Sequence, residues 1–529
     1  MDYRNVTLDD KYALVEGQAL MTGIQALVRL PLDQRRLDQI AGYDTGGFIS
    51  GYRGSPLGGY DQQLVLAQAW LTDLDVEFWP GLNEDMAATA VWGSQQLGLF
   101  PGARKEGLFG IWYGKAPGID RTGDVFKHAN AAGCAPLGGV LAVLGDDHNC
   151  KSSTLPSQSE FAMADAEIPV LNPANIQEVL DYGLHGLAMS RFSGAWSALT
   201  ALADTMDSSS VINVGLQRHQ FQQPKFEFPE DGVHIRRGDT PLEKERRLRE
   251  TKLRAAQAWV RANHLDRVLL QGRSPRLGLV VTGQAARDVF EALAALGLTP
   301  AQAADLGLSI FKVAMPWPLE PTAIRTFCEG LEQVLVIEHK RPLIEDQLRA
   351  VLYDLPDSKR PRIEGKTDVS GRPLLSSVGS ISLPEMARTI ADRLPQDGLG
   401  PVAAAYFEKL AQQGRIPASA SGTITRSPHY CSGCPHNTST RVPEGARALA
   451  GIGCHYMANF MPDRATDMTS QMGGEGVAWL GQYFATDEKH IFVNLGDGTF
   501  SHSGSLALRA AVTSQANMTY KILYNDAVA

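Results

Sequence analysis

The chain has 529 residues, of which 44% are hydrophobic and 20% are charged, and this length predicts two to four domains rather than a single core. Its formal net charge of −9 argues against electrostatic binding of nucleic acid or of an anionic membrane surface. The acidic N-terminus differs from a secretory signal, and no apolar run approaches the roughly 20 residues of a membrane span. We therefore expect a cytoplasmic protein with neither a nucleic-acid nor a membrane partner.

Residues 1–235 are predicted to form a first α/β domain. Short apolar runs at 47–50 and 139–144 alternate with helical stretches such as 84–97. This alternation indicates βα units around a parallel sheet.

Polar and charged residues follow the predicted strands of this domain. They lie in the segments Ser50–Gly59, Gly81–Ala88, Lys115–Arg121 and Gly145–Ser153. Because loops after strands often carry functional side chains, these segments are candidates for part of a site. Each also fits an ordinary turn or a solvated loop, and Glu84 also fits an acidic residue that stabilises a helix N-terminus.

The middle of the chain is predicted to hold a linker and a second α/β domain. Residues 236–270 include a strongly charged helix and form the linker. Residues 271–400 contain two strand-like runs, at 276–283 and 333–338, and a helix at 285–296. The last region, residues 401–529, is entered through a Pro- and Gly-rich connector.

Cysteines crowd at the start of this last region. The chain has only six cysteines, too few for a disulfide framework, yet Cys431, Cys434 and Cys454 lie close together in Cys-Ser-Gly-Cys-Pro-His and Gly-Ile-Gly-Cys-His. Three thiolates in glycine-containing loops suit an iron–sulfur cluster, or zinc with His436 or His455 as a fourth ligand. Small buried thiols without a ligand are the structural alternative.

The last region ends in a motif suited to a diphosphate. Gly496, Asp497, Gly498 and Thr499 follow the apolar strand 491–495. Glycines allow the backbone to approach a diphosphate, and the next helix directs its N-terminal amides toward it. Asp497 and Asn525, each after a strand, supply oxygen ligands of the kind that Mg²⁺ bridging two phosphates requires. A Gly-Asp-Gly turn with an unrelated Asn is the alternative.

The visible strands of this region are too few for a complete sheet. The pattern predicts only strand 491–495, helix 505–516 and strand 519–524. One strand pair with one crossover cannot bury both faces of a parallel sheet, so we expect further strands from outside the given sequence.

The order of these motifs resembles the 2-oxoacid:ferredoxin oxidoreductase family. The Cys-x-Gly-Cys-Pro element, the Gly-Ile-Gly-Cys element and the Gly-Asp-Gly motif occur in family order, and segments 115–121, 128–130 and 145–153 are most similar to the indolepyruvate branch. The resemblance implies a multi-domain α/β protein. In it, pyrimidine-type and diphosphate-type thiamine-diphosphate domains flank a transketolase C-terminal-like domain, and the given chain is the front part.

The resemblance also implies roles for individual residues. In the first domain, Glu84 is the acid that activates the cofactor through its aminopyrimidine, while Ser55 and Arg53 line the substrate pocket, where Arg53 departs from the family's usual proline. For Mg²⁺, the resemblance adds the main-chain carbonyl of Ala527 to Asp497 and Asn525. The iron–sulfur cluster, of the 4Fe-4S kind, is bound by Cys431, Cys434 and Cys454, with a fourth cysteine beyond residue 529.

The function implied by the resemblance is oxidative decarboxylation of a 2-oxo acid such as indolepyruvate. Electrons pass through the cluster to ferredoxin and coenzyme A takes the acyl group. The protein is expected to be a homo-oligomer, namely a dimer. A non-oxidative thiamine-dependent decarboxylase is one alternative. A zinc-stabilised nucleotide-binding protein is another, of a different class.

Overall fold

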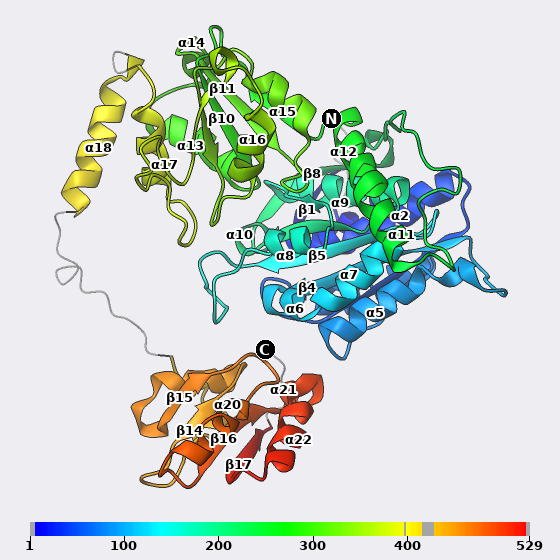
Figure 1. The fold of residues 1–529 in the computed structure, drawn as a ribbon, viewed down its shortest axis with the longest axis vertical. Coiled ribbons are helices and arrows are strands. Elements are labelled where there is room, and N and C mark those ends of the chain that lie inside the picture. The colour runs from blue at the N-terminus through cyan, green and yellow to red at the C-terminus, as the bar shows by residue number, and fades with distance from the viewer. Residues whose placement is uncertain (1–5, 396–397, 415–427, 525–529) are drawn as a thin grey trace. The chain divides into compact units, whose positions relative to one another are not determined.

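The computed structural model describes residues 6–395, 398–414 and 428–524. The chain divides into two compact units, Met1–Arg415 and Ile416–Ala529, and each is described by itself (Figure 1). Within the described ranges, no helix is both long enough and apolar enough to cross a membrane.

A six-stranded parallel sheet lies at the centre of the N-terminal half of the first unit, in the order β3-β2-β4-β5-β7-β6. Every residue of β5 and β7 is buried. Because both faces of such a sheet are covered, its strands are nearly continuous apolar runs, and this is the pattern that the sequence shows at 47–50 and 139–144. The strands are β2 (Thr45–Gly51), β3 (Val76–Phe78), β4 (Gly107–Lys115), β5 (Val140–Asp146), β6 (Val170–Leu171) and β7 (Ser197–Leu202).

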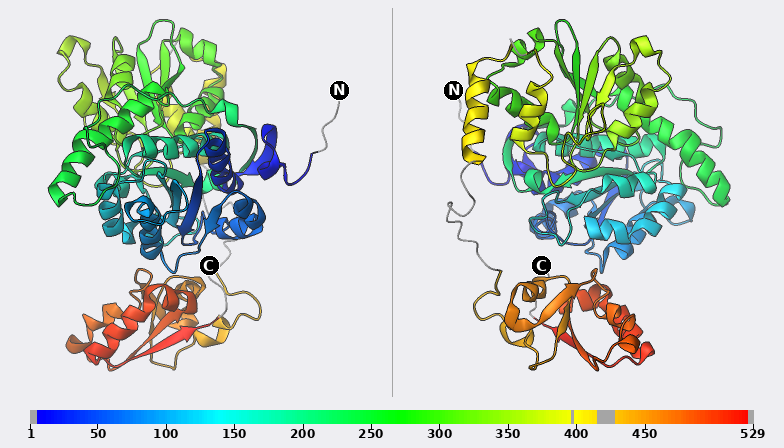
Figure 2. Two further views of the ribbon diagram at one scale, coloured as in Figure 1. Left: turned by 90° about the vertical axis from the view of Figure 1, so that its right-hand side faces the viewer. Right: turned by 60° about the vertical axis from the view of Figure 1, so that its left-hand side comes forward.

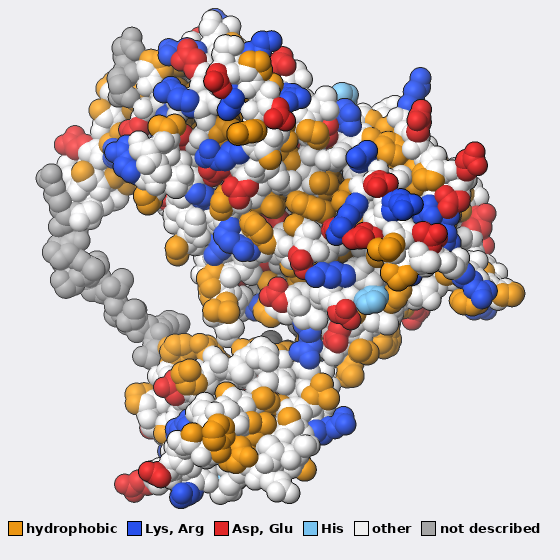
Figure 3. Space-filling view, viewed as in Figure 1, with side chains coloured by type: hydrophobic (Ala, Val, Ile, Leu, Met, Phe, Trp, Pro, Cys, Tyr) orange, Lys and Arg blue, Asp and Glu red, His pale blue; other side chains and the backbone are white. Residues whose placement is uncertain are grey.

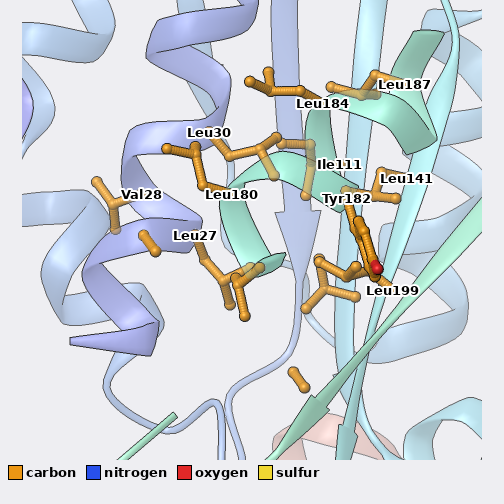
Figure 4. Close-up of a cluster of buried hydrophobic side chains, with 14 of the residues drawn as sticks. Leu27, Val28, Leu30, Ile111, Leu141, Leu180, Tyr182, Leu184, Leu187 and Leu199 are labelled. Atoms are coloured by element: carbon orange, nitrogen blue, oxygen red, sulfur yellow. The ribbon is translucent and has the colours of Figure 1, made fainter. Parts of the chain in front are cut away.

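Helices pack on both faces of this sheet. On one face, α2 (Gly23–Ile40) and α9 (Ile176–Ser193) bury leucines such as Leu27 and Leu180 against Leu141 of the sheet (Figure 4). The opposite face is covered by α5 (Glu84–Ser94) and α7 (Gly123–Ala132). The remaining elements of this half are α1 (Asp10–Ala13), α3 (Tyr60–Leu66), α4 (Gln68–Asp73), α6 (Ala116–Arg121), α8 (Glu160–Asp165), α10 (Ala203–Met206) and the antiparallel pair β1 (Glu16–Thr22) and β8 (Ser209–Gly215).

The charged segment between the two sheets is helical and packs against the first sheet's helices. Thr240 and Glu243 form a capping box that starts the helical path. Trp259 is buried in the same core cluster as the residues of α9. The elements are α11 (Pro241–Arg246), the π-helical turn η3 (Arg247–Lys252) and α12 (Leu253–Ala262).

A five-stranded sheet forms the rest of the first unit and lies in its green part in Figure 2. Its strand order is β13-β12-β10-β11-β9. Four strands are parallel, and β9 is antiparallel to β11 at one edge. The strands are β9 (Arg267–Leu270), β10 (Leu277–Thr282), β11 (Leu308–Val313), β12 (Gln333–Ile337) and β13 (Arg362–Glu364). The helices are α13 (Ala285–Ala295), α14 (Pro300–Asp305), α15 (Pro321–Cys328), α16 (Ile344–Leu352), α17 (Leu383–Ala391) and α18 (Pro401–Gly414).

A buried ion-pair cluster joins the two sheets of the first unit. The Glu178 carboxylate on α9 accepts hydrogen bonds from Nζ of Lys312 on β11 and from Arg267 on β9, the latter at 2.8 Å. Burial opposes ionisation of this carboxyl, but the charges of Lys312 and Arg267 hold the pKa of Glu178 below its usual value. Lys312 is 1% exposed, so its charge depends on this partner.

The second unit is built on a four-stranded, fully parallel sheet in the order β15-β14-β16-β17. The expectation of a single strand pair was therefore wrong. The sequence pattern missed β14 because it has only three residues, and it missed β15 because that strand reads Thr-Asp-Met-Thr and is largely exposed. The elements are α19 (His436–Ser439), β14 (Ala448–Ala450), η7 (Cys454–Phe460), β15 (Thr466–Thr469), α20 (Val477–Leu480), β16 (Ile491–Gly496), α21 (Asp497–Thr499), η10 (Phe500–Gly504), α22 (Ser505–Ser514) and β17 (Met518–Leu523).

The surfaces of the two units differ in character. Acidic and basic side chains are intermixed over the first unit in the view of Figure 3. Hydrophobic side chains are prominent on the second unit in the same view, and its exposed apolar residues include Phe484, Leu506 and Val512. The core of the second unit is small, with Trp479, Ile491 and Val493 at its centre.

Candidate functional site

The strand order of the six-stranded sheet defines a crevice at its carboxyl edge. From β2 the chain moves outward to β3 and then returns to the other side of β2 for β4. Ligands of open α/β sheets bind where the direction of winding reverses in this way. The loop after β2, which begins at Tyr52, and helix α6, which follows β4 directly at Ala116, flank that point.

Glu84 is held at this edge as the first residue of α5. Asn83 caps the helix by accepting a hydrogen bond from the Met86 amide at 3.0 Å, and Glu84 is only 6% exposed. Its side chain lies against Gly118, where a Cβ atom would be 2.4 Å from both Cγ and Oε1 of Glu84. Burial, reinforced by the Glu84 charge, raises the pKa of Tyr52 to about 12. The predicted acid therefore lies beside the loop after β2 and helix α6 after β4.

Ser55, in the loop after β2, belongs to a hydrogen-bonded network with the loop after β5. Its hydroxyl accepts a hydrogen bond from Ser152 Oγ at 2.6 Å. The Asp147 carboxylate accepts from the Ser152 amide at 2.8 Å, and Lys115 Nζ donates to the Ser152 carbonyl at 2.7 Å. Burial opposes ionisation of Asp147, but hydrogen bonds from the amides of residues 151 and 152 lower its pKa. This network fixes Ser55 from outside its own loop.

Arg53 differs from its neighbours because its side chain is exposed. Its charge acts on Tyr52 and Asp61, lowering the pKa of each against the larger opposite effect of burial. Lys115 is a second cation at this edge, and burial lowers its pKa. Sequence reasoning selected Arg53 and named Lys115 only as part of a motif.

The second unit has its own crevice between β14 and β16. From β14 the chain passes to β15 on one side and then crosses to β16 on the other, so the winding reverses between β14 and β16. Gly451-Ile452-Gly453 follows β14, and Gly496-Asp497-Gly498-Thr499 follows β16. The Thr499 hydroxyl donates to the Ile452 carbonyl at 3.2 Å and joins the two loops.

Asp497 begins a long helical path at this crevice. The path runs through α21 and the π-helical turn η10 into α22, ending at Ser514. Its first amides and Asp497 therefore meet at the carboxyl edge of the sheet, where an anion is stabilised. Asn525 and Ala527, the other two predicted Mg²⁺ ligands, lie outside the described residues.

The three cysteines lie in one region of the second unit. Cys431 is exposed, whereas Cys434 and Cys454 are half-buried. Burial and then the charges of Cys434 and Cys431 raise the pKa of the Cys454 thiol, which indicates that the three sulfurs are near one another. In the described parts of the chain, however, no three His, Cys, Asp or Glu side chains converge as ligands of one metal ion.

Sequence reasoning missed one buried residue of this unit, Glu475, and gave two others, His436 and His455, only a possible role as zinc ligands. Burial lowers the pKa of both histidines while the Asp497 charge opposes that shift, so both rings lie near Asp497. Glu475 is fully buried and accepts from the Gly473 amide at 2.8 Å. The Gly-Gly-Glu-Gly signal was visible at 473–476, but the strand before it was not recognised.

Sequence comparison shows that the chain is similar to indolepyruvate oxidoreductases. Residues 267–415 match the family model described as "Indolepyruvate oxidoreductase domain". Indolepyruvate oxidoreductase subunit IorA of Pyrococcus horikoshii is 25% identical over 422 residues, which are 73% of this chain and 60% of that protein. The IorA subunit of Methanothermobacter thermautotrophicus is 25% identical over 445 residues, 81% of this chain and 65% of that protein. The chain is therefore similar to the IorA subunit over about three quarters of its length.

The family model and the IorA relatives match different shares of the chain. The family model spans β9 to the end of the first unit, which is the five-stranded sheet with its helices. The chain spans about 60% of the length of the P. horikoshii IorA protein. A solved structure, 2-oxoglutarate:ferredoxin oxidoreductase from Magnetococcus marinus with 2-oxoglutarate, coenzyme A and succinyl-CoA bound, is 14% identical with a TM-score of 0.49, over 71% of this chain and 65% of that one.

The second unit offers a cradle that fits a diphosphate with its metal. There is no room for a Cβ atom at Gly451, because it would lie 2.3 Å from Cγ of Glu475. A Cβ atom at Gly496 would be tightly packed, at 3.1 Å from Cε1 of His455. The glycines therefore let both loops pack directly on the buried side chains of Glu475 and His455. Buried polar atoms without a hydrogen-bond partner in the described structure include Nδ1 of His436 and Nε2 of His455. The carboxylate of Asp497 supplies a hard oxygen donor for Mg²⁺, and the cysteine thiols are suitable donors for an iron–sulfur cluster.

Proposed function

We propose that the chain is the thiamine-diphosphate-binding part of a 2-oxo acid:ferredoxin oxidoreductase that acts on an aryl 2-oxo acid such as indolepyruvate. The observation that carries the proposal is the Gly-Asp-Gly-Thr loop at the winding reversal of a parallel sheet, beside the loop that leads to Cys454. The similarity to IorA supports the substrate class. Coenzyme A and ferredoxin are the proposed co-substrate and acceptor, and a homo-oligomer, most simply a dimer, is the proposed assembly.

Glu84 is proposed to hold and protonate the cofactor's aminopyrimidine. When bound, thiamine diphosphate supplies a nucleophilic carbon and takes up the electron pair released on decarboxylation. A buried carboxyl group at a helix start, fixed by Asn83 and by close packing on Gly118, can donate a hydrogen bond in one orientation only. Its exclusion from solvent prevents water from competing for that hydrogen bond.

The substrate is proposed to bind over the network around Ser55. The Ser55 hydroxyl, fixed by Ser152, can donate to the 2-oxo or carboxylate oxygen of the substrate. Arg53, which is exposed, and Lys115 are the cations near this edge that can attract the carboxylate. The carboxylate of Asp147 keeps the loop closed on Ser152.

Asp497, with Asn525 and the Ala527 carbonyl, is proposed to hold Mg²⁺, while the glycines and Thr499 surround the diphosphate. Cys431, Cys434 and Cys454 are proposed to bind a 4Fe-4S cluster that carries single electrons away. We further propose the division into 1–235, 236–270, 271–400 and 401–529 as pyrimidine-type domain, helical linker, transketolase C-terminal-like domain and cluster loop with diphosphate-type domain.

The proposal is tested with the anaerobically purified natural full-length protein. Coenzyme A, a dye acceptor and either indolepyruvate, phenylpyruvate or pyruvate are supplied, and acyl-CoA formation is measured together with iron and thiamine diphosphate content. We expect activity with preference for the aryl substrates. The variants Glu84→Gln and Asp497→Asn should lose at least about 100-fold in activity, whereas Glu77→Gln, an exposed change on β3, should not.

Three outcomes would reject the proposal in different ways. Equal rates with all three substrates would remove the aryl preference. Decarboxylation without dye reduction would indicate the non-oxidative enzyme. Zinc without iron, combined with no retained thiamine diphosphate, would favour the zinc-stabilised nucleotide-binding protein.

A further inference from the structure

Two buried histidines of the second unit lie between the cysteine loops and the Gly-Asp-Gly loop. His436 follows Cys-Ser-Gly-Cys-Pro, and His455 directly follows Cys454. Each side chain is 2% exposed, and the ring centroids are 6.4 Å apart in an edge-to-face arrangement. The two motifs that provide the cysteines therefore also provide a pair of buried imidazoles.

The glycine loops at the crevice are built around the ring of His455. A Cβ atom at Gly496 would lie 3.1 Å from Cε1 of His455, and one at Gly453 would lie 3.3 Å from the same atom. A Cβ atom at Gly451 would lie 2.9 Å from Nε2 of His455 and 2.7 Å from Oε1 of Glu475. His455 thus contacts both the loop after β14 and the loop after β16, which are the loops proposed to surround the diphosphate.

Backbone and ring contacts fix the positions of both histidines. The Tyr430 hydroxyl donates to the His455 carbonyl at 3.2 Å, and the Tyr430 ring packs on His436 at a centroid distance of 5.6 Å. The Thr440 hydroxyl donates to the His436 carbonyl at 2.6 Å. These contacts hold the rings without using their free nitrogens, Nδ1 of His436 and Nε2 of His455, which are buried and have no partner among the described residues.

A buried ring nitrogen without a hydrogen-bond partner lowers stability unless a ligand or a water molecule forms the missing hydrogen bond. A role for either histidine as the fourth ligand of a cysteine-bound metal needs its nitrogen to converge with the thiols. In the described ranges, no three His, Cys, Asp or Glu side chains converge in that way. By contrast, the His455 ring contacts Gly496, the residue before Asp497. His455 therefore packs against the loop that is proposed to bind the diphosphate.

We propose that Nδ1 of His436 and Nε2 of His455 hydrogen-bond phosphate oxygens of the diphosphate cofactor, and that neither histidine is a ligand of the cysteine-bound metal. The inference rests on the proposed function, because it takes thiamine diphosphate as the occupant of this crevice. A neutral imidazole presents one N–H donor, which suits a phosphate oxygen. Both histidines are therefore positioning residues for the cofactor.

The side-chain amides of Asn and Gln provide a matched test of which nitrogen is used. An Asn side chain places its amide near the Nδ1 position of histidine, whereas Gln extends to near the Nε2 position. His436→Asn and His455→Gln should therefore keep most of the affinity for thiamine diphosphate with Mg²⁺. The exchanged pair, His436→Gln and His455→Asn, should weaken binding about 10- to 100-fold, the range for losing a hydrogen bond to a charged group.

The measurement is calorimetric titration of the full chain with thiamine diphosphate and Mg²⁺, together with metal analysis of each variant. We expect iron content to be the same in all four variants and in the wild type. His128→Leu, an exposed change in α7, is the control for generic effects. Thermal unfolding identifies any variant that has lost its fold, and the two amides at each position differ by only one methylene group.

The outcomes separate this inference from the proposed function. If the wild type does not bind thiamine diphosphate, the proposed function fails. If the wild type binds it and the exchanged variants bind equally well, only the role of the histidines fails. Loss of iron from His436 or His455 variants with unchanged thiamine diphosphate affinity would assign them to the metal instead and overturn the inference.

Discussion

Replacing Gly118 with alanine tests the position of Glu84 with one methyl group. The new Cβ atom would lie 2.4 Å from Cγ and Oε1 of Glu84, whereas ordinary contacts begin at 3.4 Å. Glu84 must therefore move by about 1 Å, and a misplacement of that size can reduce catalysis about 100-fold. Overpacking at such a site costs about 1–3 kcal/mol of unfolding free energy. We expect both losses in Gly118→Ala.

The control for Gly118→Ala is Gly123→Ala. Gly123 is helical, and apart from its chain neighbours and its own helix backbone no atom lies within 4 Å of the ideal Cβ position, so its replacement tests the Gly-to-Ala change without the collision. Acyl-CoA formation measures activity, and urea denaturation measures stability. In a double-mutant cycle, Glu84→Ala removes the atoms that collide, so the same Gly118→Ala change should then cost much less stability. An equal cost with and without the Glu84 side chain would refute the reasoning.

Two further predictions concern buried polar contacts of the first unit. Glu178→Gln leaves Lys312 without a full counter-charge and should lower the unfolding free energy by about 3–5 kcal/mol. Because the pKa of Glu178 is lower in the folded state, its contribution to the unfolding free energy is present above the unfolded pKa of about 4.3 and is lost as pH falls through the folded pKa. Urea denaturation at pH 7 and at pH 3 measures this loss. Ser152→Ala removes the hydrogen bond to Ser55 and should raise KM for the 2-oxo acid about 5- to 10-fold. Ser153→Ala, which lacks that contact, should leave KM unchanged; equal effects of the two serine variants would contradict the assignment.

Much of the fold was predictable where apolar periodicity was strong. The runs at 47–50, 139–144 and 333–338 lie in strands β2, β5 and β12 or extend one residue beyond, because buried parallel strands are continuous apolar segments. The strands missed from the sequence, β14 and β15, are short or polar. Their positions are set by pairing with β16 and with each other rather than by their own composition. The sequence therefore could not show that the second unit has a four-stranded sheet.

The candidate site was predictable by residue type but not by its supports. Glu84 and Asp497 were identified from their motifs, and the structure places each after a parallel strand at a helix start. The contact of Gly118 with Glu84 and the hydrogen bond between Ser152 and Ser55 join segments that are far apart in sequence. Such partners become visible only when the order of strands is known.

The winding of the sheets explains why these partners come from particular loops. In the six-stranded sheet and in the four-stranded sheet, the winding reverses beside the first strand, so the segments that follow β2 and β4, and those that follow β14 and β16, are brought together. Glycines in these segments leave space for the side chains that pack on them: Gly118 leaves space for Glu84, and Gly496 leaves space for His455. A glycine in such a loop is then evidence about the side chain opposite it. This relation makes the glycine variants more direct tests of the site than changes to the acidic residues themselves, because they move a side chain without altering its charge.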